Sequence, residues 1–301
     1  MKKKILAVAI AAIMLLTAVA SISLAYLTDT DKQDNVFTIG NVKIQQIEYE
    51  RVKDKNGNKT SELKLFSNNQ KVYPAVYGLP KELGGDPARS TLTVNGSEFT
   101  IRNFPNYIDK MVTVGNIGNS EAYVRVIVAV PVIPNEDASD GDVSENWIHT
   151  NFISDTDTDV NNGWYYGFKE EWPTKEDGTT DYDKHYVIEN VKINDKFYDL
   201  TVITNIKKLA PSQETAPCLT GFYLDNSLNC DEGGWFMPSD DEDGKIYVID
   251  ATENMVAENL ILVATQAVQC EGFTDAWQAF AASFGEITET NHPWYVAPVE
   301  Q

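Results

Sequence analysis

The chain has 301 residues, of which 24 are basic and 45 are acidic, so its formal net charge at pH 7 is -21. A surface of this charge repels phosphate backbones and anionic lipid headgroups, which argues against nucleic acid as a partner. Three cysteines are too few for a disulfide scaffold. The length fits one large domain if the fold is all-β.

Residues 1–25 have the composition of an export signal. Three lysines near the start precede an apolar run over residues 5–20, and small residues follow the run. This pattern predicts a cleaved signal peptide and a secreted mature chain of residues 26–301, located in the extracellular matrix or at the cell surface. The alternative is a permanent membrane anchor, because residues 5–25 are long enough to cross a bilayer.

The cleavage region comprises Leu24, Ala25 and Tyr26. Small side chains at Ser23 and Ala25 suit a cut before Tyr26. The residues that follow, 27–35, are nearly all polar or acidic. Cleavage therefore leaves a solvated arm at the new N-terminus.

The arm leads into the first predicted strand. Four apolar residues alternate there: Phe37, Ile39, Val42 and Ile44. They share one face of a strand only if Gly40 and Asn41 form a bulge that absorbs one residue of the period of two. A segment that is half strand and half solvated arm is able to pair inside its own fold or to add to the edge of a neighbour.

Farther along the chain, apolar runs alternate with turn residues, which is typical of antiparallel β structure. The predicted strands span residues 42–52, 61–66, 91–94, 98–102, 110–114, 122–130, 185–193, 197–207, 219–224, 246–249 and 260–268. Asn-Gly pairs at Asn56 and Asn95 predict two hairpin turns. Residues 73–87 and 131–183 are interpreted as long loop insertions, the second with a short helix near residues 145–152.

A short helix is predicted near the C-terminus, with Thr274 as its N-cap and Gly285 as its end. Its apolar stripe comprises Ala276, Trp277, Phe280 and Phe284. Together, these elements predict an all-β fold, an antiparallel two-sheet sandwich with long loops and a short C-terminal helix, in one domain over residues 26–301.

The predicted strand over residues 122–130 is apolar on both faces, which is typical of a central strand. Its core-facing residues are predicted to be Val124, Val126, Val128 and Val130. Tyr123, Arg125 and Ile127 then lie on the opposite face. We expect Arg125 to pair with a carboxylate there.

No catalytic signature is present in the sequence. A zincin helix needs two histidines one turn apart with a glutamate between them, and His149, His185 and His292 are isolated from one another. No Gly-x-Ser-x-Gly or cysteine-centred nucleophile motif occurs either. The residues therefore predict a protein that is not an enzyme and needs no cofactor.

Structural calcium is the one metal for which the sequence offers candidates. Asp155, Asp157 and Asp159 have the spacing of a calcium loop, but Val160 replaces the glycine of its sharp turn. A second partial match contains Asp241 and Asp243, with Gly244 in the turn, Asp250 in the twelfth place and Ser239 in place of the first carboxylate. A solvated acidic loop explains either stretch equally well.

Cys218 and Cys230 are spaced to close one disulfide loop in an oxidising exterior, with Cys270 left over as a buried small side chain. Aromatic residues gather in the loop-rich part of the chain: Trp147, Trp164, Trp172, Trp235, Tyr165 and Tyr166. They either cover the ends of the sandwich or line a surface for glycan or protein.

Three separated stretches resemble the TasA, CalY and camelysin family. They are AYLTDTDKQDNVFTIGNVKI at residues 25–44, MVTVGNIGNSEAYVRVIVAVP at residues 111–131 and LILVATQAVQCEGFTDAWQAFAASFG at residues 260–285. The resemblance implies a jelly-roll topology and export through a SipW-type signal peptidase, for which a cut before Ala25 is also allowed. In this family Ala is usual at the position of Cys270.

The resemblance also implies a function, the assembly of secreted subunits into biofilm or cell-surface fibres by donor-strand exchange. The implied donor arm is residues 26–39, with Tyr26, Leu27, Val36, Phe37 and Ile39 as its donor residues. The implied partners are further copies of the chain, the SipW-type peptidase and an accessory matrix protein. Two alternatives stay open: a monomeric surface-binding module for glycan or protein, and a camelysin-like metalloprotease.

Overall fold

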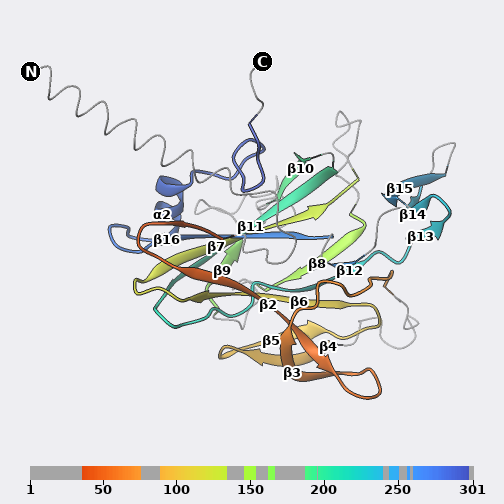
Figure 1. Ribbon diagram of the computed structural model, residues 1–301, viewed down its shortest axis with the longest axis horizontal. Coiled ribbons are helices and arrows are strands. Elements are labelled where there is room, and N and C mark those ends of the chain that lie inside the picture. Colours follow the sequence, from red (N-terminus) through yellow and green to blue (C-terminus); the bar gives the residue numbers. More distant parts are fainter. Residues whose placement is uncertain are drawn as a thin grey trace, which may run out of the picture. The chain divides into compact units, whose positions relative to one another are not determined.

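The computed structural model describes residues 36–75, 89–133, 146–153, 162–166, 187–194, 196–239, 244–250, 256–257 and 260–297. All of them belong to one compact unit, Asn35–Gln301. The described residues form an all-β fold with one short helix, as the sequence predicts (Figure 1).

Two large sheets make up most of this unit. In the first, the strands lie in the order β1 (Val36–Ile39), β16 (Leu262–Gln269), β7 (Ala122–Pro131), β11 (Lys196–Leu209) and β10 (Val187–Ile193), and β9 (Trp164–Tyr166) also pairs with β11. In the second, the order is β3 (Lys59–Leu65), β2 (Ile44–Lys53), β6 (Ile108–Asn116), β12 (Leu219–Leu224) and β8 (Ile148–Phe152).

Two small sheets complete the fold. One has the strand order β13 (Asn229–Asp231), β14 (Gly234–Pro238) and β15 (Lys245–Asp250), and the other pairs β4 (Arg89–Val94) with β5 (Ser97–Arg102). Apart from β1 with β16, the pairs of named strands are antiparallel.

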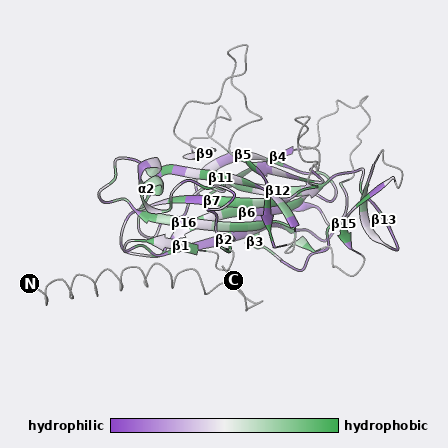
Figure 2. Ribbon diagram, turned by 90° about the horizontal axis from the view of Figure 1, so that it is seen from above, coloured by the Kyte–Doolittle hydropathy of each residue, from purple (hydrophilic) through white to green (hydrophobic). Residues whose placement is uncertain are grey.

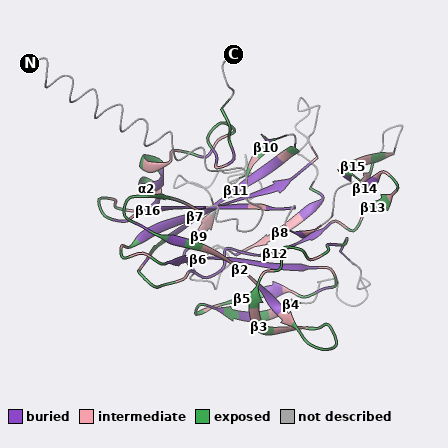
Figure 3. Cartoon of the chain, in the orientation of Figure 1, coloured by how far each residue is buried: buried purple, intermediate pink, exposed green. Residues whose placement is uncertain are grey.

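The main core lies between the two large sheets. Val124, Val126, Val128 and Val130 of β7 pack there, as predicted, with residues of β6 and β12 such as Val112 and Phe222. Burial is continuous along β6, β7 and β12 (Figure 3), and apolar residues dominate β7 (Figure 2). Two sheets that bury their facing sides against each other form a sandwich.

The outer faces of both sheets are partly covered. The β4–β5 hairpin packs Leu92 and Phe99 against Met111 of β6, so it covers the second sheet. The helix α2 (Ala276–Ser283) packs Ala276 and Phe280 against the side of the first sheet that carries Tyr123 and Val268. These contacts explain why β6 and β7 are buried on both faces.

Both predicted Asn-Gly hairpins are confirmed, but their turns differ. Asn95 and Gly96 both have positive φ, 50° and 80°, as a two-residue turn of the hairpin type requires. In the β2–β3 turn only Gly57 has a positive φ, 84°. There Asp54 closes a longer turn by accepting hydrogen bonds from the backbone N–H groups of Asn56 and Asn58.

Two local predictions are wrong. The helix expected near residues 145–152 is the strand β8, because β12 offers it a complete antiparallel ladder that local sequence does not reveal. The N-cap of α2 is Asp275 instead of Thr274, since its carboxylate accepts the N–H of Gln278 at 2.9 Å. In α2, Trp277 is only half-buried. Within the described residues no helix has the length and apolarity to cross a membrane.

Candidate assembly site at the leading strand

The leading strand β1 occupies one edge of the first sheet. It pairs in parallel with β16, in a register that places Val36 opposite Thr265 and Ile39 opposite Val268. Parallel pairs are slightly less stable per residue than antiparallel ones, and this pair is only four residues long. β1 is therefore an edge strand that only a short, parallel described ladder holds to this sheet.

A fixed corner joins β1 to the rest of the domain. Gly40 has a φ of +90°, and a Cβ at this position would lie 2.9 Å from the Cβ of Gln269. The side chain of Gln269 also accepts the N–H of Asn41 at 2.9 Å. Here the chain leaves the sheet that contains β1 and enters the sheet that contains β2. Only glycine fits the first position of this corner.

The corner corrects the expected apolar face. Val36 packs against the core cluster that contains Val42 and Ile44. Ile39 is 38% exposed. The period of two needs no bulge, because the chain changes sheet at residues 40–43 instead of continuing as one strand. The side chain of Phe37, like the expected donor residues Tyr26 and Leu27 and the cleavage residue Leu24, lies outside what the structure describes.

Two other edge strands of the large sheets, β3 and β10, carry features that hinder pairing with another molecule. β3 alternates charged residues such as Lys59, Glu62 and Lys64 along its length. β10 has an irregular register between Ile188 and Val191. Charges and irregularities of this kind prevent an edge strand from pairing with another molecule.

The strand β16, which neighbours β1 in the sheet, is also held by contacts that do not involve β1. β16 pairs with β7 over its whole length, from Leu262 opposite Ala129 to Gln269 opposite Ala122. Its Gln266 accepts a hydrogen bond of 2.5 Å from Nε of Arg125 on β7. β16 therefore keeps its place whether or not β1 is paired with it.

Arg125 has no carboxylate partner among the described residues, contrary to the prediction. Besides Gln266, it donates to the backbone carbonyl of Gly285 at 3.3 Å, and its guanidinium lies 4.7 Å from the ring centroid of Phe280. Burial lowers the pKa of this guanidinium. α2 covers this part of the sheet, so the described groups around the guanidinium are an amide, a carbonyl and an aromatic ring.

The expected disulfide is also absent, since all three cysteines are free thiols. Cys218 is fully buried in the main core at the start of β12, whereas Cys230 is exposed on β13. The two thiols belong to different environments that sequence spacing does not distinguish. Cys270 is buried beside α2, as predicted.

The candidate metal and catalytic residues are only partly described. Asp155, Asp157, Asp159, Asp241 and Asp243 lie outside the described residues, as does His185. Within the described part of the chain, no group of three histidine, cysteine or acidic side chains is placed to hold a metal ion. His149 pairs with Asp225 at 2.8 Å, and burial lowers the pKa of His292.

Two of the aromatic residues of the loop-rich part are buried instead of exposed. Trp147 and Trp164 are buried in the main core, and Nε1 of Trp164 donates to the carbonyl of Ala216 at 2.8 Å. Trp235 is half-buried on β14. Trp172 lies outside the described residues. The alternative in which these tryptophans line a surface for glycan or protein therefore loses two of its four members.

One buried ionic cluster was missed by the sequence reasoning. Asp109 of β6 accepts hydrogen bonds from Arg51 at 2.7 Å and from Lys59 at 2.8 Å. Arg51 also donates to the carbonyl of Arg102 at 2.8 Å. The cluster ties the β2–β3 hairpin to β5 and β6. The only sequence signal was an acidic residue followed by a lysine inside an otherwise apolar strand.

Comparisons of the chain with protein-family models, with curated proteins and with solved structures found no match.

Proposed function

We propose that the chain is a secreted structural subunit that assembles into extracellular fibres of a biofilm or cell-surface matrix by donor-strand exchange. The resemblance of three segments to the TasA, CalY and camelysin family motivates this proposal. The structural observation that supports it is the parallel, four-residue edge strand β1, which a single corner at Gly40 joins to the domain. The jelly-roll topology of the strands is part of the same proposal.

The exchange requires that β1 leave β16 at a small cost. The four-residue pair contributes a few backbone hydrogen bonds, each worth about 1 kcal/mol. A strand held by a few kcal/mol opens in a minor population of molecules. β16 stays paired with β7 along its other side, so it offers the same edge to an arriving strand.

The arriving strand comes from a second copy of the chain. A swapped strand remakes the contacts that it left, so exchange between copies conserves most of the interaction energy. We propose β16 as the acceptor strand and residues 26–39 as the donor arm. Pairing of residues 26–35 with the acceptor then supplies the extra free energy that offsets the loss of translational freedom.

Removal of the leader precedes assembly in this proposal. An uncut apolar segment over residues 5–20 would hold the arm at the membrane. A SipW-type signal peptidase is the proposed processing enzyme, and an accessory matrix protein is a further proposed partner. The product is a secreted homopolymer that needs neither a cofactor nor a catalytic residue.

Locking β1 onto its own β16 tests the proposal. Thr38 lies opposite Ala267, so the pair Thr38→Cys and Ala267→Cys, in a Cys230→Ser background, is placed to close a disulfide within one molecule. We expect the mature protein to form filaments in electron microscopy when reduced and to stay monomeric when oxidised. The Thr38→Cys variant alone, in the same background, is the matched control and should assemble under both conditions.

Deletion of residues 26–35 gives the complementary test, because it removes the arm and keeps β1. Filaments should then be lost while the thermal unfolding temperature stays close to that of the mature protein. Filaments that persist after this deletion or after oxidation would contradict exchange of the leading strand. Monomeric mature protein that binds glycans would favour the surface-binding alternative.

A further inference from the structure

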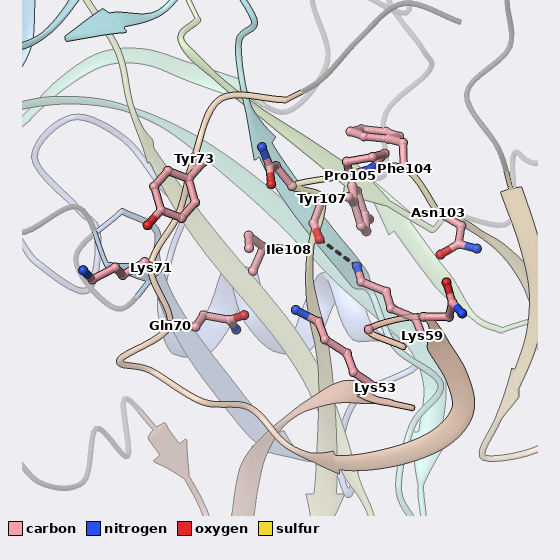
Figure 4. A pocket seen from close by; sticks show the side chains of 13 residues that line it. Lys53, Lys59, Gln70, Lys71, Tyr73, Asn103, Phe104, Pro105, Tyr107 and Ile108 are labelled. Carbon is pink, nitrogen blue, oxygen red and sulfur yellow. Dashed lines mark hydrogen bonds between the residues drawn. The ribbon is translucent and has the colours of Figure 1, made fainter. Parts of the chain in front are cut away.

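A cavity of about 620 Å³ lies between the β2–β3 hairpin, residues 70–73 and the turn from β5 into β6 (Figure 4). This volume is typical of a small-molecule site. Three lysines, Lys53, Lys59 and Lys71, line the cavity, and none of the described residues that line it is acidic. The chain as a whole has 45 acidic and 24 basic residues, so this positively charged lining contrasts with the negative net charge of the protein.

Lys59 is fixed at the base of this lysine cavity. Its amino group donates to the carbonyl of Tyr107 at 2.7 Å and to Asp109 at 2.8 Å, and its side chain is only 12% exposed. Burial lowers the pKa of Lys59 although Asp109 opposes that change. Because Asp109 also pairs with Arg51, one carboxylate serves two cations. The cluster keeps one positive charge in excess beneath the cavity.

Lys53 supplies a second amino group, which no described residue holds by a hydrogen bond or an ion pair. Lys53 lies opposite Lys59 in the β2–β3 ladder. Figure 4 shows the Lys59 amino group directed at the carbonyl of Tyr107, with the Lys53 side chain nearby and Lys71 farther away. Two neighbouring ammonium groups without a shared carboxylate repel each other. An anion placed between them removes this repulsion.

The nearby acidic side chains are already engaged elsewhere. Glu50 pairs with Lys64 at 2.7 Å and accepts a hydrogen bond from Gln70 at 2.8 Å. Asp54 accepts hydrogen bonds within its own turn. Neither residue lines the cavity. Within the described residues, Asp109 pairs with Lys59 but is shared with Arg51, so the lysine cavity keeps a net positive charge.

We propose that the lysine cavity binds a sugar acid, a small carbohydrate that carries a carboxylate. The carboxylate lies between Lys53 and Lys59, since charge-assisted hydrogen bonds to a carboxylate are the strongest contacts this lining offers. The amides of Gln70 and Asn103 face the sugar hydroxyls, and the 49% exposed Tyr73 offers a ring for the apolar face of the sugar. The site does not depend on exchange of the leading strand.

Isothermal titration calorimetry of the mature protein with sodium glucuronate tests this proposal, with glucose and sodium phosphate as comparison ligands. We expect saturable binding of glucuronate that weakens as salt is added, and much weaker binding of glucose and of phosphate. Lys53→Gln should weaken glucuronate binding about tenfold. Lys53 is exposed at the end of β2, so this variant keeps the fold.

Lys55→Gln is the matched control. Lys55 is exposed in the turn of the same hairpin and does not line the cavity. Its substitution changes the net charge by the same amount as Lys53→Gln. Its affinity for glucuronate should equal that of the unmodified protein. The proposal is overturned if glucuronate shows no saturable binding, if glucose or phosphate binds as tightly, or if both lysine variants weaken binding equally.

Discussion

Thr265 pairs in parallel with Val36 on one side and in antiparallel with Val126 on the other. The two sides of β16 are therefore held differently: β7 pairs with all eight of its residues, while the described pairing with β1 covers four. A short parallel pair at the edge of a sheet costs little to release, because it has few ladder hydrogen bonds and parallel pairing is slightly less stable per residue. This asymmetry makes β1 the proposed exchange element.

The corner between the sheets should be sensitive to any side chain at Gly40. Gly40→Ala must adopt a positive φ and must also place its Cβ 2.9 Å from the Cβ of Gln269. We expect it to destabilise the domain by about 1–3 kcal/mol beyond the backbone cost. Gly57→Ala is the control, because Gly57 also has a positive φ but has no atom within 4 Å of the added Cβ. Urea unfolding of both variants measures the difference, and equal losses would contradict a close contact at the corner.

The buried cluster around Asp109 should dominate the acid sensitivity of the β2–β3 hairpin. Burial alone would raise the pKa of Asp109, but the hydrogen bond from Arg51 and the charge of Lys59 hold this pKa below its ordinary value of 3.8. Asp109→Asn leaves two buried cations without their carboxylate, so we expect a loss of about 3–5 kcal/mol at pH 7.

The pH dependence of this loss has a definite sign. A carboxylate with a depressed pKa in the folded state stabilises the protein above pH 3.8, and this contribution disappears as the pH falls through the folded-state pKa. Urea unfolding at a series of pH values should show the difference between the parent and Asp109→Asn shrinking below pH 3.8. Glu62→Gln, which removes an exposed carboxylate from β3 of the same hairpin, is the control for general effects of charge.

Arg125 and Gln266 should behave as a coupled pair. Arg125→Met leaves the buried oxygen of Gln266 without its donor, which costs about 1–3 kcal/mol. Adding Gln266→Leu removes that unpaired group, so the double variant should recover much of the loss. A double-mutant cycle from thermal or urea unfolding measures the coupling. Strictly additive losses would show that the hydrogen bond between these two side chains contributes little.

The three thiols should differ in reactivity. Cys230 is exposed, whereas burial raises the pKa of Cys218 to about 12 and that of Cys270 to about 11. A thiol reagent at pH 8 should therefore add once to the native protein and three times after unfolding, as counted by mass spectrometry. Cys230→Ser should abolish the native adduct. If the native protein reacts with the reagent only after reduction, a disulfide is present instead.

Much of the strand content followed from the sequence alone. The alternation in β7 identified the four valines that line the core, and the Asn-Gly pairs identified both hairpins, because these signals depend on neighbouring residues. The burial of Cys270 was also predicted. The candidate site was only partly predictable: β1 was expected as a strand, but Val36 packs on the core and the expected core residue Ile39 is exposed.

The tertiary structure decided everything that depends on distant partners. β8 is a strand because β12 pairs with it. Arg125 contacts Gln266 of the neighbouring strand and Phe280 of α2, which folds over its sheet. β1 pairs in parallel with β16, and the corner at Gly40 sends the chain from there into the other sheet. The lysine cavity likewise brings together residues from three separate segments. Local periodicity specifies which side of a strand is apolar, whereas the packing of segments far apart in the chain specifies what that side meets.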